Sequence, residues 1–150
     1  MDNIHAAILV EQMKKAEGFL ARRLEIYRRY AEGLRGVEGI ELLSIRPEAR
    51  HACHLFTVLV ESARRDAVLE ELQKRGVGVS VNFYPAHLMT YYRERFGCRP
   101  GMFPAAEAIG ARTISLPLYP KLDEPEIDYV IDTVIDVVQN GRSPHRTRMR

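Results

Sequence analysis

Cysteine is scarce in this sequence, because only Cys53 and Cys98 occur among its 150 residues. Two cysteines make no disulfide framework, and they are typical of reduced thiols in a cytoplasmic protein. Long apolar runs are also missing, since no stretch approaches the roughly 18 residues that a membrane-spanning helix needs. The second residue, Asp2, is acidic and lies in a stretch that reads as helix, so no signal peptide is predicted. We therefore expect a cytoplasmic protein with no membrane partner.

An excess of basic charge is missing as well, once the C-terminus is set aside. Residues 141–150 hold four arginines and no acid. Subtracting these four from the 22 basic residues leaves 18 against 20 acidic ones. A nucleic-acid-binding domain normally carries a basic face, and this balance argues against that class. A chain of this length is most simply one domain, and we expect it over residues 1–140, followed by a disordered basic tail over 141–150.

Residues 2–34 are predicted to form one long helix. Apolar side chains recur along it at steps of three and four, which is the pattern of one apolar stripe. The stripe consists of Met13, Ala16, Leu20, Leu24, Tyr27, Ala31 and Leu34. Gly33 and Gly36 mark the end of the helix. A helix of this length usually extends beyond one small core, towards another domain or subunit.

Short strands and two more helices are predicted after the long helix. The strand candidates are residues 39–43, 53–61 and 77–83, together with an extended piece over 113–120. One helix runs from an N-cap at Ser62 to Gly76. The last helix is capped by Asp123, has Pro125 in its first turn and ends at Gly141. This order predicts an α+β fold, with a small and mostly antiparallel sheet covered by helices.

Histidine and cysteine do not occur at a metal-binding spacing. The sequence HACH places His51, Cys53 and His54 together, but it matches no standard structural zinc pattern. In a strand His51 and His54 would point to opposite faces. A nucleophilic Cys53 would need a partner histidine and an oxyanion-type glycine turn, and no such turn accompanies it. We therefore predict no metal site and interpret Cys53 as a small buried apolar residue.

The stretch SVNFYPAHLMTYYRERFG, residues 80–97, holds the strongest candidate for a binding site. Asn82, Tyr84 and His87 directly follow a predicted strand, and binding groups collect at strand ends. Pro85 stiffens the turn between them. An imidazole held in this way can bind a phosphate, a carboxylate or a sugar hydroxyl.

Two interpretations of this stretch stay open on the residues alone. In the first, His87 is exposed at the loop and binds a ligand, while Tyr91 and Tyr92 pack it in place. In the second, His87 is only a capping group, and the two tyrosines belong to the core.

Five blocks of the sequence carry a resemblance to a known family. They are MDNIHAAILVEQMKK, ARRLEIYRRYAEGL, HACHLFTVLVE, RDAVLEELQKRGVGVSVNFYPAHLMTYYRERFG and ISLPLYPKLDEPEIDYVIDTV. Together they resemble the C-terminal part of the DegT/DnrJ/StrS family, whose members are pyridoxal-phosphate-dependent aminotransferases that make amino sugars on nucleotide carriers. The resemblance covers roughly residues 1–138. The AH and YYRERF segments look most similar to the branch that makes 4-amino-4-deoxy-L-arabinose.

The resemblance implies that the cofactor-binding part of the enzyme is absent from this chain. In the family an N-terminal large domain holds pyridoxal phosphate and supplies the lysine that forms the Schiff base. The four lysines here are Lys14, Lys15, Lys74 and Lys121, and none matches that context. Because this chemistry needs such a lysine, we expect no catalytic and no cofactor-binding residue in this chain. The chain is interpreted as the small domain of such an enzyme, inactive alone.

The resemblance also implies a role for the candidate loop. His87 matches the family's histidine in this loop, which lies near the nucleotide-sugar substrate. Asn82 stands where members often have histidine, and Tyr84 stands at a variable position, so both are assigned to substrate binding. The expected partners are a large aminotransferase domain or a second copy of the chain. The alternatives are a non-catalytic dimerisation or partner-binding module and a sugar dehydratase of the same family.

Overall fold

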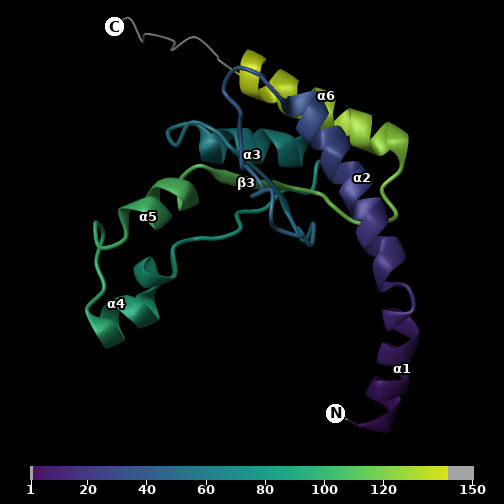
Figure 1. Cartoon of the computed structure of the whole chain (residues 1–150). Coiled ribbons are helices and arrows are strands. Elements are labelled where there is room, and N and C mark those ends of the chain that lie inside the picture. Colours follow the sequence, from purple (N-terminus) through teal and green to yellow (C-terminus); the bar gives the residue numbers. More distant parts are fainter. Residues whose placement is uncertain (1, 142–150) are drawn as a thin grey trace, which may run out of the picture.

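The computed structural model describes residues 2–141, and it has the expected α+β fold (Figure 1). The elements, in chain order, are α1 (Asn3–Met13), α2 (Ala16–Leu34), β1 (Glu41–Leu42), β2 (Phe56–Leu59), α3 (Arg65–Lys74), the 3-10 turn η1 (Ala86–Leu88), α4 (Thr90–Phe96), α5 (Pro104–Gly110), β3 (Thr113–Leu116) and α6 (Glu124–Asn140). The predicted tail lies outside the described residues, apart from Gly141. No helix in the described part of the chain is long and apolar enough to cross a membrane.

The sheet is small and antiparallel, as predicted. Its strand order is β1-β2-β3, and Phe56 pairs with Leu116 in the central ladder. The strand predicted over 77–83 is wrong, because Ser80 alone forms a bridge, to Ser115. Two other backbone groups of this segment form hydrogen bonds with α3 instead. The Val77 amide donates to the Leu72 carbonyl, and Gln73 Nε2 donates to the Val79 carbonyl.

The predicted single N-terminal helix is also wrong, because a turn at Lys14 and Lys15 divides it into α1 and α2. The Lys15 amide donates to the Gln12 carbonyl at 3.0 Å, which closes the end of α1 tightly. A break of two residues hardly disturbs a spacing of three and four, so the apolar pattern did not reveal it. No residue of α1 is buried, so no core packing holds α1 in line with α2.

The core lies between the sheet and helices α2, α3 and α6. On α2 the fully buried residues are Ile26, Tyr30 and Leu34, at a spacing of four. The predicted stripe through Leu24 and Tyr27 is only half-buried, so the helix is rotated relative to the prediction. The cluster is completed by apolar residues of the other elements: Phe56, Val58, Val60, Val68, Leu72, Val77, Val79, Ile114, Leu116, Leu122, Ile127, Val130, Ile131, Val134, Val137 and Val138.

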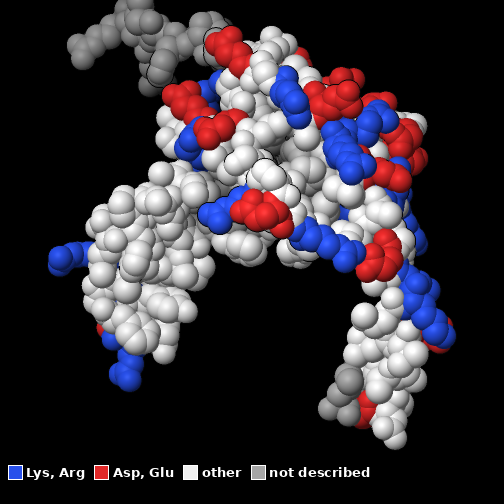
Figure 2. Space-filling view, in the orientation of Figure 1, with Lys and Arg blue, Asp and Glu red and all other residues white. Residues whose placement is uncertain are grey.

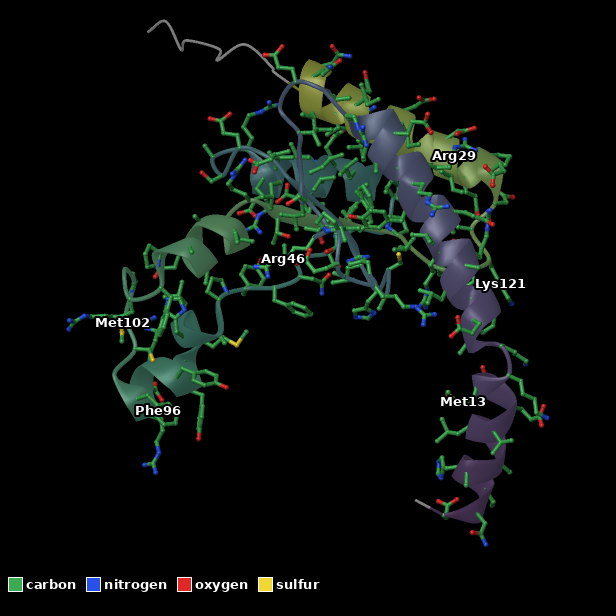
Figure 3. All side chains as sticks on the ribbon, in the orientation of Figure 1. Met13, Arg29, Arg46, Phe96, Met102 and Lys121 are labelled. Carbon is green, nitrogen blue, oxygen red and sulfur yellow. The ribbon has the colours of Figure 1, made fainter. Side chains whose placement is uncertain are left out.

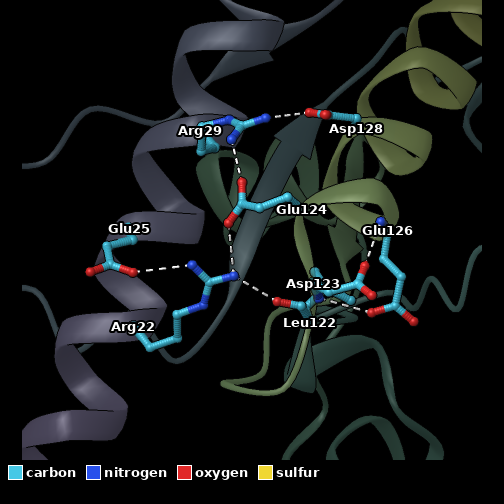
Figure 4. Close-up of polar contacts among 8 residues, drawn as sticks. All are labelled: Arg22, Glu25, Arg29, Leu122, Asp123, Glu124, Glu126 and Asp128. Carbon is cyan, nitrogen blue, oxygen red and sulfur yellow. Dashed lines mark hydrogen bonds and ion pairs between the residues drawn. The ribbon is translucent and has the colours of Figure 1, made fainter.

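Polar contacts join α2 to the start of α6 (Figure 4). Arg22 Nη2 donates to the Leu122 carbonyl at 2.8 Å and to Glu124 Oε1 at 3.0 Å. Arg29 forms ion pairs with Glu124 and Asp128. These contacts link α2 to the first turn of α6 at the surface of the molecule.

The first turn of α6 is capped as predicted. Asp123 Oδ1 accepts from the Glu126 amide at 2.9 Å, and Glu126 Oε2 accepts from the Asp123 amide at 3.0 Å, which is a complete capping box. Ser62 does not cap α3, because that helix starts at Arg65 behind Arg64 and has no side-chain cap.

We expect Asp123→Ala to lower the free energy of unfolding by about 1 kcal/mol, because it leaves the Glu126 amide without its acceptor. Urea titration of the purified chain measures this loss. Asp123→Asn is the matched control, since asparagine caps helices as well as aspartate does. An alanine variant as stable as the parent would show that the cap contributes nothing.

Two projections extend from the core, and both carry exposed apolar side chains (Figure 1). The first, which we call the α1 arm, is residues 3–13. The second, the aromatic lobe, is residues 83–110. Figure 2 shows that both are mainly uncharged on this face and that the molecule is hollowed between them. The exposed apolar residues of the lobe are Phe83, Tyr84, Met89, Tyr91, Tyr92, Phe96, Met102, Phe103 and Ile109.

Candidate functional site

The candidate loop begins where the chain leaves the sheet at Ser80. Ser80 Oγ donates to Asn82 Oδ1 at 2.6 Å, so the loop itself uses the side-chain oxygen of Asn82. The Asn82 carbonyl accepts from Thr113 Oγ1 at 3.3 Å, which ties the loop to β3. The peptide bond between Asn82 and Phe83 is cis. The side-chain nitrogen of Asn82, Nδ2, has no hydrogen-bond partner among residues 2–141 and is the donor that a ligand could use.

Tyr84 lies on the surface with a cation beside its ring. The guanidinium carbon of Arg65 is 5.6 Å from the centre of the Tyr84 ring. Arg65 is itself buried, and its Nη1 donates to the Gly110 carbonyl at 3.2 Å while its Nε donates to Asp66 Oδ1 at 2.6 Å. Arg65 therefore connects α3, the candidate loop and the end of α5. No pattern in the sequence distinguishes Arg65, because it is one of many arginines on predicted helices.

Gly110 brings the aromatic lobe back onto the candidate loop. A Cβ atom on Gly110 would lie 2.6 Å from Cδ of Pro85 and 3.3 Å from the Phe83 carbonyl oxygen. Only a residue without a side chain fits this close approach. The end of α5 thus packs against the turn at Pro85. The loop is held by α5 as well as by the hydrogen bond from Thr113 on β3.

His87 is buried, which contradicts the first of the two interpretations, that it is exposed at the loop. Its side chain is 8% exposed, and its Nε2 lies 2.9 Å from Oε1 of Glu107 on α5. The ring of Phe103 meets the His87 ring edge-on, with 4.8 Å between centres.

The two tyrosines expected to pack against His87, or to lie in the core, do neither. Tyr91 and Tyr92 are exposed and contact each other and Phe96 on α4. Both lie on α4, at the outer edge of the lobe, where no core faces them (Figure 3).

Glu107 is the residue that organises this part of the lobe. Besides His87, its carboxylate accepts from the amides of Gly101 at 2.8 Å and Phe103 at 3.3 Å. The hydrogen bond from His87, followed by those from the two amides, lowers the pKa of Glu107 below its ordinary value. The sequence analysis missed Glu107, although an acid inside the apolar run MFPAAEAIG was a visible signal.

Cys53 is fully buried, as predicted, and it is not set up as a nucleophile. Burial raises the pKa of its thiol, and the charges of Arg23 and Arg28 only partly oppose this. His51 Nδ1 lies 3.4 Å from Cys53 Sγ. His51 and His54 precede β2 and are not part of a strand, so the prediction of opposite strand faces is wrong. Among residues 2–141, no three His, Cys, Asp or Glu side chains are grouped to hold a metal ion.

None of the four lysines has the surroundings of an imine-forming residue. All four are exposed: Lys14, Lys15, Lys74 and Lys121. Lys14 Nζ bonds Glu11 Oε1 at 2.6 Å, and Lys121 lies in the turn before α6 (Figure 3). An imine-forming lysine needs a desolvated or electrostatically tuned position, so these residues do not fit pyridoxal phosphate.

Comparison with known proteins decides the family. The sequence profile of the DegT/DnrJ/EryC1/StrS aminotransferase family matches residues 1–135. The chain belongs to this family. The resemblance described from the sequence is therefore confirmed, and the fold agrees with it. The branch within the family stays a prediction.

The relatives in this aminotransferase family are much longer than the chain. The uncharacterized protein MJ1066 of Methanocaldococcus jannaschii is 39% identical over 95% of this chain and 38% of its own length. The spore coat polysaccharide biosynthesis protein SpsC of Bacillus subtilis is 32% identical over 94% of this chain and 38% of its own. The putative sugar aminotransferase Spr1654 of Streptococcus pneumoniae, in its PLP form, is 31% identical and superposes with a TM-score of 0.88 over 95% of this chain and 37% of its own.

Proposed function

We propose that this chain is the C-terminal small domain of a pyridoxal-phosphate-dependent nucleotide-sugar aminotransferase of polysaccharide biosynthesis, and that it is inactive alone. The observation that carries this proposal is the family match over residues 1–135 in a chain that spans 38% of its relatives' length. The four exposed lysines support it, because none has the surroundings of a Schiff-base residue. The PLP form of Spr1654 and the biosynthetic role in the name of SpsC support the cofactor and the pathway class.

In this proposal the cofactor is held by a large domain outside this chain. When bound there, pyridoxal phosphate supplies the imine chemistry of amino transfer. The residues of this chain contribute binding and orientation only. His87, Asn82 and Tyr84 form the substrate side of the site, with Arg65 and Glu107 holding the loop behind them.

The isolated chain is therefore expected to form no specific aldimine with pyridoxal phosphate. Borohydride reduction after incubation with the cofactor, followed by peptide mapping, tests this. We expect low labelling spread over Lys14, Lys15, Lys74 and Lys121, because all four are exposed. Free lysine amide at the same concentration is the control for non-specific reaction. Stoichiometric labelling of one lysine would overturn the proposal that the chain holds no cofactor site.

The α1 arm supports the proposed partners, a large domain or a second copy of this chain. Ile4, Ile8, Leu9 and Met13 are all exposed, at 75%, 55%, 47% and 70%. An apolar surface of this kind usually marks an interaction site. We propose that the arm and the aromatic lobe together receive the large domain in the full-length enzyme.

In the absence of that domain the isolated chain is expected to self-associate through the α1 arm. Sedimentation velocity at tens of micromolar measures this. The double variant Ile4→Glu/Ile8→Glu should shift the protein towards monomer, because burying a carboxylate in an apolar contact is unfavourable. The matched control is Leu43→Glu, which changes an exposed apolar residue elsewhere. A clean monomer of the parent chain would contradict self-association.

The alternative function is a non-catalytic dimerisation or partner-binding module derived from such an enzyme. The exposed arm and lobe are compatible with it as well. Joining this chain to a large domain of the family separates the two. Aminotransferase activity with a nucleotide sugar supports the enzyme, whereas stable assembly without activity supports the module.

A further inference from the structure

The tautomer of His87 follows from its contact with Glu107. Nε2 lies 2.9 Å from Oε1, and an ionised carboxylate can only accept hydrogen bonds. The lowered pKa of Glu107 keeps that carboxylate ionised near neutral pH. The hydrogen therefore resides on Nε2, and in the neutral ring Nδ1 carries a free electron pair.

Glu107 can fix the ring in this way because it is itself fixed. Its carboxylate accepts from the Gly101 amide at 2.8 and 3.1 Å, so both oxygens are engaged. Its backbone belongs to α5, whose end is braced against Pro85 through Gly110. The edge-on ring of Phe103 limits rotation of the imidazole on another side. The ring is thus held by a charge-assisted hydrogen bond and by packing, both from α5 and the turn before it.

The second ring nitrogen is left for a ligand. Nδ1 of His87 has no hydrogen-bond partner among residues 2–141. Among the described side chains, only Arg23 Nε is sealed from solvent without a hydrogen-bond partner. His87 Nδ1 is therefore not a sealed atom of this kind. The ring is buried, but this nitrogen is not completely sealed from solvent. Because the side chain is held in one position, this nitrogen can form a hydrogen bond of fixed direction with a substrate group.

We propose that Glu107 is a positioning residue, which holds His87 in the Nε2–H form and so presents Nδ1 as a hydrogen-bond acceptor for a sugar hydroxyl of the substrate. The functional half of this inference rests on the proposed function, whereas the control of the tautomer does not. Glu107 does not touch the substrate in this arrangement. It acts through His87, much as a carboxylate orients the histidine of a catalytic triad.

The tautomer is tested on the isolated chain by long-range ¹H–¹⁵N correlation spectra of ¹⁵N-histidine-labelled protein at about pH 8.5, where a histidine of ordinary pKa is neutral. The chain has five histidines, and the signals lost in His87→Ala identify this ring. We expect the Nε2–H form alone for His87 in the parent chain. In Glu107→Gln, which keeps the size of the side chain, we expect a mixture of both tautomers. A parent ring in the Nδ1–H form or in a mixture overturns the proposal, even if the variant does not fold.

Activity of the chain joined to a large domain tests the functional half. His87→Ala and Glu107→Gln are each expected to lower kcat/KM for the nucleotide sugar by roughly tenfold or more, and the double variant to lose little beyond the larger single loss. The half-reaction with the amino donor alone should not change.

Two results are informative in opposite ways. If His87→Ala lowers nucleotide-sugar use and Glu107→Gln does not, positioning by Glu107 is overturned while the proposed function stands. If neither variant changes the use of the nucleotide sugar although the Nε2–H form is observed, the substrate role of His87 in the proposed function is overturned. The functional half of this inference is then overturned as well.

Discussion

Tyr30→Ala is expected to lower the free energy of unfolding of the isolated chain by about 3–5 kcal/mol, which is the usual cost of removing a large buried aromatic side chain. Tyr30 is fully buried on α2 and packs against Phe56 with 5.1 Å between ring centres. Its hydroxyl donates to the Pro117 carbonyl at 2.9 Å. Burial raises the pKa of Tyr30, so this hydroxyl keeps its proton at neutral pH. Urea unfolding followed by circular dichroism measures the loss.

Tyr30→Phe separates the two contributions to this loss. It keeps the packing against Phe56 and removes the hydroxyl, so we expect a cost of about 1 kcal/mol from the unpaired Pro117 carbonyl. Tyr91→Ala is the surface control, because Tyr91 is exposed on α4, and its cost should stay within about 0.5 kcal/mol. A Tyr30→Ala variant that loses less than about 1 kcal/mol would show that α2 is not packed on the sheet as described.

His87→Ala is expected to lower the free energy of unfolding by about 2–3 kcal/mol, more than an exposed loop histidine could contribute. The variant leaves Glu107 without its side-chain partner and opens a space beside Phe103. Thermal melts and urea titrations of the isolated chain measure this effect. His54→Ala is the matched control, because His54 is exposed and lies outside the lobe. A change below about 0.5 kcal/mol in His87→Ala would contradict the burial of this ring.

The pH dependence of this difference follows from Glu107. Its pKa in the folded chain is below the ordinary value of 4.5, chiefly because of the hydrogen bond from His87. A depressed carboxylate pKa contributes stability that is fully present above the ordinary pKa and is lost as the pH falls through the folded value. The difference between parent and His87→Ala should therefore be full near pH 7 and shrink under acidic conditions below the ordinary pKa of Glu107. A difference that stays unchanged well below the ordinary pKa of Glu107 would contradict the pairing.

A large effect on stability does not exclude the proposed substrate role of His87. The sequence analysis treated an exposed ligand-binding histidine and a packed histidine as alternatives. In the structure Glu107 binds one ring nitrogen, while the other has no hydrogen-bond partner among residues 2–141. The ring is thus a packed residue on one edge and a possible binding residue on the other. For this reason, the effect of His87→Ala on the stability of the chain and its effect on substrate use have to be measured separately.

The sequence by itself determined the features that depend on neighbouring residues. The cap at Asp123, the helix that ends at Gly141 and the strands around Phe56 and Leu116 were all predicted, because capping, turn chemistry and apolar spacing are local. The family was also predicted, because its blocks are read directly from the sequence order. The burial of Cys53 followed from the small apolar character of its side chain.

Only the tertiary structure decided which side chains meet across the fold. The partner of His87 is Glu107, twenty positions away on another helix, and no spacing rule reaches that far. The face of α2 that enters the core, with Ile26 and Tyr30, depends on where α6 lies. The break between α1 and α2 lies where the buried surface ends, because no residue of α1 is buried. Long-range contacts of this kind depend on how the helices and strands pack against one another. A pattern in the sequence predicts only the individual helices and strands.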